Sequence, residues 1–170
     1  PGRKTDMRDA QWIATLLRAG LLKGSFIPDK TFRELRHLTR YRKSIVHDIT
    51  AQKNRIDKFL QSSGFRFTAF LSDAFGASGR NIIRHLMEYG SISREALDRC
   101  LKTQTRKRID EILIALNGSL SEHQRNFLRM IFGHLEALEQ HRHTVEDAIT
   151  EEITKHEEAL RLLCSIPGID

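Results

Sequence analysis

Apolar side chains recur every three or four residues along two long stretches of the chain, which is the period of an α-helix with one buried face. The first stretch runs from residue 31 to residue 63 and contains neither Pro nor Gly. Its apolar positions are Leu35, Leu38, Ile45, Ile49, Ile56 and Phe59, with Arg42 and Gln52 interrupting them. This seam predicts one long helix that needs a partner helix.

The second stretch begins at Ser121, which forms a capping-box pattern with Gln124. Its seam is Leu128, Ile131, Leu135, Leu138, Arg142, Val145 and Ile149, followed after a one-residue slip by Ile153, His156, Leu160 and Leu163. The pattern predicts one helix that continues through the slip. Two helices with matching heptads predict a coiled coil, formed antiparallel within the chain, between two chains, or both.

The remaining segments also have helical periods. Residues 5–23 predict a first helix, with Asp6 as its cap, and Asp29 is expected to cap the long helix after it. Residues 65–120 predict a compact cluster of short helices between the two long ones. No stretch has the alternation of a strand, so the predicted fold class is all-α.

Charge changes this picture because it is distributed unevenly. Residues 1–66 carry 15 Lys and Arg against 6 Asp and Glu, whereas residues 121–170 carry 5 against 10. A basic ladder of Arg33, Arg36, Arg40, Lys43 and His47 lies nearly opposite the first seam. A ladder of this kind favours a polyanion such as nucleic acid, although a solvated charged surface gives the same composition. The candidate nucleic-acid-binding residues are Arg33, Arg36, Arg40, Lys43, Lys53, Arg55, Lys58 and Arg80.

Few other residues suggest chemistry. Asp6 and Asp9, three apart, place two carboxylates on one helix face, which suits a shared Mg²⁺ but equally suits a cap and a favourable first turn. The turn of residues 76–80 either holds a phosphate with Arg80 or is an ordinary turn capped by Ser78. The eight histidines show no zinc spacing.

Cys100 and Cys164 provide no disulfide framework, and no apolar run reaches the ~20 residues that cross a bilayer. These features predict a cytoplasmic protein with no membrane partner. The first residue is not Met, which suggests a fragment of a longer protein.

Several separate segments, in order, resemble DEDD-type transposases, the family that includes Piv-like DNA invertases. They are Gly2-Arg3-Lys4-Thr5-Asp6-Met7-Arg8-Asp9-Ala10, Arg33-Glu34-Leu35-Arg36, Leu38-Thr39-Arg40-Tyr41-Arg42, Lys53-Asn54-Arg55, the run from Leu71 to Arg80, and Ile166-Pro167-Gly168-Ile169. The resemblance implies a RuvC-like nuclease domain with four acids, a helical coiled-coil region, and a C-terminal domain with a serine nucleophile. Asp6 and Asp9 match the last two acids; the other acids and the serine lie outside this chain, and Ser165 does not match the serine.

The resemblance therefore implies three regions. Residues 1–24 end the nuclease domain, residues 25–165 form the coiled-coil domain with its insert at 65–120, and residues 166–170 start the C-terminal domain. The implied parent enzyme recombines DNA with Mg²⁺ and a structured guide RNA, and the isolated fragment is expected to be inactive. We expect a homodimerising, nucleic-acid-binding scaffold that forms its dimer through the long helices. The alternative is a helical interaction module with no nucleic-acid role.

Overall fold

The structure is a computed structural model that describes residues 5–168. All regular elements in that range are helical, which confirms the all-α prediction. The chain divides into two compact units, residues 1–34 and residues 35–170, which are described separately below. The predicted domain boundaries at residues 24 and 165 remain predictions.

The first unit contains helix α1 (Asp6–Arg18), which is shorter than predicted. Thr5 caps α1, since its hydroxyl accepts the N–H of Arg8 at 3.4 Å, so the prediction of Asp6 as the cap was wrong. The helix ends early because Gly20 takes a positive φ of 70°, which lets the N–H of Leu21 return to the carbonyl of Leu16. Further on, the Asp29 carboxylate accepts the N–H of Phe32 at 3.1 Å and caps the next helix as predicted.

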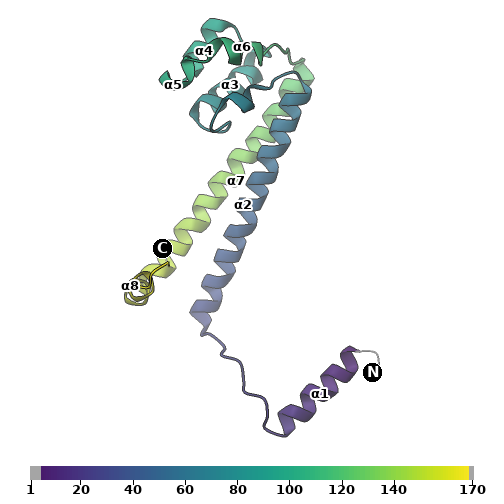
Figure 1. The fold of residues 1–170 in the computed structure, drawn as a ribbon, viewed down its shortest axis with the longest axis vertical. Coiled ribbons are helices and arrows are strands. Elements are labelled where there is room, and N and C mark those ends of the chain that lie inside the picture. The colour runs from purple at the N-terminus through teal and green to yellow at the C-terminus, as the bar shows by residue number, and fades with distance from the viewer. Residues whose placement is uncertain (1–4, 169–170) are drawn as a thin grey trace. The chain divides into compact units, whose positions relative to one another are not determined.

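The second unit is built on two long helices, α2 (Lys30–Ser62), which starts in the first unit, and α7 (Glu122–Thr154). Figure 1 shows them side by side and antiparallel, with the short helices at the end where α2 stops and α7 starts. Contacts between them follow this register, with Arg42 against Glu146 and Phe59 against Phe127. The two seams therefore pair within one chain. The predicted capping box at the start of α7 is present.

Five short elements connect the long helices. They are η1 (Phe67–Phe70), α3 (Ala77–Tyr89), α4 (Arg94–Cys100), α5 (Thr103–Arg106) and α6 (Ile109–Ile114). One apolar core joins η1, α3, α4 and α6 to α2 and α7, and its fully buried side chains include Ile56, Leu60, Phe65, Phe67, Ile82, Ile83, Leu86, Leu97, Ile112, Leu128 and Leu135. The insert is thus packed onto one end of the helix pair rather than forming a separate core.

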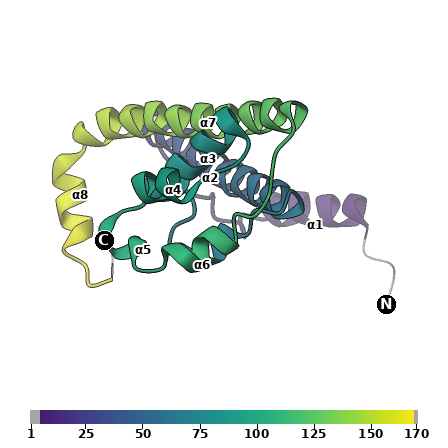
Figure 2. The same cartoon turned by 90° about the horizontal axis from the view of Figure 1, so that it is seen from above.

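The second long helix ends earlier than its sequence pattern predicts. α7 stops at Thr154, a turn follows, and α8 (Glu157–Cys164) runs in a different direction, as Figure 2 shows. The break coincides with the one-residue slip at Ile153. One residue rotates the apolar face by about 100°, so a straight helix would carry that face off the core. The break makes the prediction of one helix continuing to Leu163 wrong, and α8 itself has no buried residue.

Each polar residue that interrupts a seam has a polar partner, and no charged side chain in residues 5–168 is buried without one. Gln52 is 2% exposed, and its amide donates to the carbonyl of Ile131 at 2.7 Å. The guanidinium of Arg42, 46% exposed, lies 2.7 Å from the Glu146 carboxylate. Arg142 approaches the same carboxylate at 3.6 Å. Both seam arginines therefore converge on Glu146 at the edge of the helix pair.

Candidate nucleic-acid interface

A row of cations follows the outer face of α2, away from its buried seam. We call Arg36, Arg40, Lys43 and Lys58 the basic strip; all four side chains are exposed. None of the four forms an ion pair with any residue in the described range 5–168. From the first to the last residue the strip extends about 33 Å at 1.5 Å per residue. His47 lies on the same face, and Arg33 precedes the strip within α2 but belongs to the first unit.

The basic strip is free because the seam fixes which way α2 faces. Ile45, Ile49 and Ile56 are buried against α7 and the insert, so the opposite side of the helix is left in solvent. Positions separated by three or four residues stay on one side of a helix, which aligns the four charges. Unpaired charges in a line produce a positive field that attracts a polyanion.

Three other candidate residues are engaged inside the protein. Arg55 donates to the side chain of Gln52, and Lys53 lies 3.9 Å from Glu139. Arg80 is held most firmly, because its guanidinium donates to both Glu139 oxygens at 2.6 and 2.7 Å and to the carbonyl of Phe75 at 2.7 Å. These contacts give the three residues structural roles that do not need nucleic acid.

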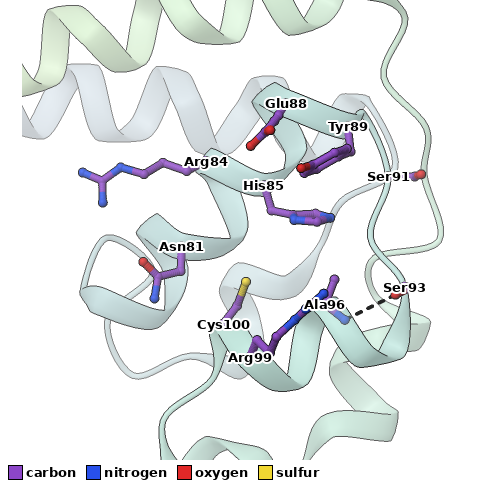
Figure 3. Close-up of a pocket in the computed structure, with 10 residues that line it drawn as sticks. All are labelled: Asn81, Arg84, His85, Glu88, Tyr89, Ser91, Ser93, Ala96, Arg99 and Cys100. Carbon is purple, nitrogen blue, oxygen red and sulfur yellow. Dashed lines mark hydrogen bonds between the residues drawn. The ribbon is translucent and has the colours of Figure 1, made fainter.

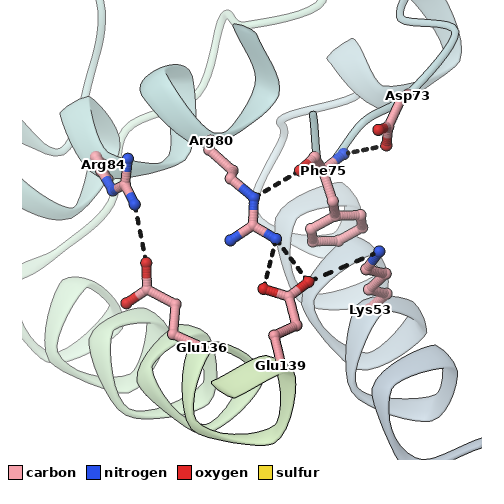
Figure 4. A network of polar contacts seen from close by, with 7 residues as sticks. All are labelled: Lys53, Asp73, Phe75, Arg80, Arg84, Glu136 and Glu139. Carbon is pink, nitrogen blue, oxygen red and sulfur yellow. Dashed lines mark hydrogen bonds and ion pairs between the residues drawn. The ribbon is translucent and has the colours of Figure 1, made fainter. Parts of the chain in front are cut away.

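Figure 4 shows how Glu139 connects three helices. Its carboxylate on α7 faces Arg80 on α3 and Lys53 on α2, and the Lys53 ammonium also lies 5.6 Å from the centre of the Phe75 ring. The Arg80 and Glu139 side chains are 20% and 22% exposed, so water screens this pair less than a surface pair. We call Lys53, Arg80 and Glu139 the clamp.

The turn before α3 has a packing function. A Cβ atom on Gly79 would lie 1.9 Å from the carbonyl oxygen of Ala74, so only glycine fits where the helix meets the preceding chain. Gly76, not Ser78, is the N-cap, and the Ser78 hydroxyl instead accepts the N–H of Lys102 at 3.1 Å. The start of α3 is thus bound to the chain at Lys102 through Ser78, and Arg80, two residues further on, contacts Glu139.

Asp6 and Asp9 lie in the first turn of α1, three residues apart, as predicted. Hard oxygen ligands of this kind suit Mg²⁺, which commonly uses one or two carboxylates and keeps several waters. No group of three or more His, Cys, Asp or Glu side chains in residues 5–168 is arranged to hold a metal. A magnesium ion at this pair would therefore need further ligands. Within the same range, no helix has the length and apolar character that a membrane span requires.

The fold is that of an all-α protein built on two long antiparallel helices. Comparison with known proteins finds a similarity in the N-terminal part of the chain: residues 1–64 match the family model DEDD_Tnp_IS110, described as a transposase. The putative transposase y4qE of Sinorhizobium fredii (strain NBRC 101917 / NGR234) is 36% identical over 61 residues, which are 36% of this chain and 16% of that protein. No solved structure matches the chain. The matches confirm the resemblance to DEDD-type transposases, and the matched residues include Asp6, Asp9 and the whole basic strip.

Proposed function

We propose that this chain is part of a transposase that acts in DNA transposition in the cytoplasm, and that its second unit is a scaffold that holds nucleic acid. The basic strip carries the proposal, because it is a line of unpaired, exposed cations within the stretch that matches the transposase family. Contacts from such side chains to phosphates bind DNA or a structured guide RNA without reading bases. Arg33, in the first unit, is proposed as a further phosphate contact in its own right.

The proposed role of Asp6 and Asp9 is to hold Mg²⁺ together with two acids from the parent protein. When bound, the ion would stabilise the attacking and leaving oxygens of a phosphodiester. Asp6 and Asp9 both lie in the first turn of α1, and a three-residue spacing places two positions on one side of a helix. With two carboxylates alone, the isolated chain is not expected to cleave DNA.

The strip is tested by changing Arg36, Arg40 and Lys43 together to Gln and measuring binding to a DNA duplex and to an RNA hairpin at several salt concentrations. Each lost phosphate contact makes the slope of log affinity against log salt shallower by about 0.9 for duplex DNA. For three contacts, the wild-type affinity should fall about 40-fold more than the variant affinity between 50 and 200 mM salt.

A matched control changes Arg94, Arg106 and Arg108 to Gln, which removes the same charge from the insert. Those arginines pair with Asp110, Asp98 and Glu111, respectively. We expect the control to bind nearly as tightly as the wild type. If both variants lose affinity equally, only net charge matters and the strip is not the site. If neither loses affinity, the proposal is wrong.

The proposed homodimer must use a surface other than the two seams, since these already face each other within one chain. α8 offers such a surface, because Leu160, Leu162 and Leu163 are 41%, 63% and 50% exposed. Light scattering after size-exclusion chromatography should show a dimer that Leu162→Glu dissociates. Ile114→Glu, at an apolar side chain that is 78% exposed on α6, is the control and should remain dimeric. A monomeric wild type would contradict this part of the proposal.

A further inference from the structure

A groove of about 750 Å³ lies between α3 and α4. One wall is a row of Asn81, His85 and Tyr89, four residues apart on one side of α3. The other wall is formed by α4 and includes Arg99 and Cys100. The volume lies in the range of small-molecule sites, but the lining is polar and aromatic rather than aliphatic. Figure 3 shows these side chains around the groove.

The aromatic part of the wall is a ready stacking surface. The rings of His85 and Tyr89 lie 4.5 Å apart between centroids and are inclined by 36°. Tyr89 is 61% exposed, so much of its ring is accessible to a ligand. An exposed aromatic side chain of this kind stacks well on a planar base, and stacking tolerates any base because each has a π-face.

The charges of the groove separate into an engaged and a free group. Arg84 is directed to Glu136 at 2.9 Å, whereas Arg99 forms no ion pair with any residue in the described range 5–168. Glu88 lies beside Tyr89 on α3, and its hydrogen bond raises the pKa of the phenol. A phosphate is therefore repelled from the Glu88 side and attracted to the Arg99 side, while the Tyr89 ring stays neutral.

Cys100 lines the groove but is not a reactive nucleophile. Its side chain is half-buried, and burial raises the pKa of the thiol, which keeps it protonated at neutral pH. Among the described residues, Cys100 forms no side-chain hydrogen bond with His85, the imidazole that lines the same groove. The groove is thus suited to binding and not to covalent catalysis.

We infer that this groove binds one unpaired nucleotide of a single-stranded nucleic acid, with the base stacked on Tyr89, whose ring packs against His85, and the phosphate on Arg99. The inference rests on the proposed function only in taking nucleic acid as the partner. A paired base is stacked inside its duplex and cannot reach the aromatic wall, so the groove selects single strands, loops and ends. The basic strip, by contrast, makes no such distinction.

The test measures fluorescence anisotropy with a labelled single-stranded oligocytidylate of eight nucleotides and with a DNA duplex, using the full chain. Tyr89→Ala should weaken binding of the single strand by about 5- to 160-fold, the range found for loss of one stacked base, and should leave duplex binding within about twofold. Tyr89→Phe keeps the ring and should bind as the wild type does. Arg99→Gln should also weaken single-strand binding.

The inference is overturned if Tyr89→Ala and Arg99→Gln bind the single strand as tightly as the wild type, or if they weaken both ligands equally. The charge-neutralised strip variant separates the two proposals. If that variant binds the duplex normally while Tyr89→Ala still loses the single strand, the strip proposal fails and the groove stands. If the variant loses the duplex while Tyr89→Ala changes nothing, only the groove inference fails. Because Tyr89 is largely exposed, its substitution should not unfold the protein, which circular dichroism will confirm.

Discussion

Substitution of Glu139 by Ala tests whether the clamp holds the insert onto the helix pair. The change removes the carboxylate that accepts two hydrogen bonds from Arg80 and faces Lys53. Two cations on α3 and α2 would then lie near each other without their common partner. The variant should therefore lose more stability than removal of one surface ion pair would cost.

The magnitude follows from the exposure of the pair. Fully exposed pairs contribute about 0.2–1 kcal/mol, and removing one partner of a buried pair costs about 3–5 kcal/mol. Arg80 and Glu139 are roughly one-fifth exposed and joined by two charge-assisted hydrogen bonds, so we expect a cost of about 2 kcal/mol. For a chain of this size, that corresponds to a fall in Tm of about 4–8 °C.

A matched control lies one helical turn away on α7. Glu136 accepts one hydrogen bond from Arg84, but these side chains are 45% and 55% exposed. Glu136→Ala should therefore cost less than about 1 kcal/mol. Urea unfolding should be followed by circular dichroism, because the single Trp12 lies in the first unit and does not report on the second. Equal losses in the two variants would refute the argument that burial sets the strength of the clamp.

Three further predictions concern the rest of the fold. Gly79→Ala should destabilise the protein by about 1–3 kcal/mol through its clash with Ala74, whereas Gly133→Ala, in open space within α7, should stabilise it by up to about 1 kcal/mol; thermal unfolding of both distinguishes steric from helix-propensity effects. Exposed Cys164 should react with a thiol reagent at pH 7 faster than Cys100, whose pKa is raised by burial, and Cys164→Ser should abolish the fast phase; one common rate would contradict this. Backbone and Ser93 hydrogen bonds lower the pKa of Glu95, so its support of α4 is present above the ordinary carboxyl pKa and is lost as pH falls through the lowered value; carboxyl titration by NMR should show that lowered midpoint.

The sequence predicted the helices well because their patterns are long. The seam on α2 and the start of α7 at Ser121 each depend on local periodicity and capping, which a sequence displays directly. The pairing of the two seams within one chain was left open, because two matching heptad patterns are also compatible with two chains. The apolar period slips by one residue just before the break after Thr154. Whether a helix bends, continues or stops at such a slip depends on tertiary packing, which the apolar period alone does not give.

In the candidate site, too, features set by local helical geometry were predicted, and features set by contacts between distant residues were not. Arg36, Arg40 and Lys43 were predicted to lie opposite the seam, and the structure leaves them exposed and unpaired within the described range because helical geometry alone determines that face. Arg80 was predicted to hold a phosphate at the turn that starts its helix, yet Glu139, 59 positions away in sequence, engages it, and no local pattern indicates such a partner. The α3–α4 groove was missed for the same reason. The four-residue spacing of His85 and Tyr89 was readable, but only the fold places Arg99 across from them. An exposed cation is therefore a candidate for binding only after its partners within the fold are known, and that criterion separates the strip and Arg99 from Arg80 and Lys53.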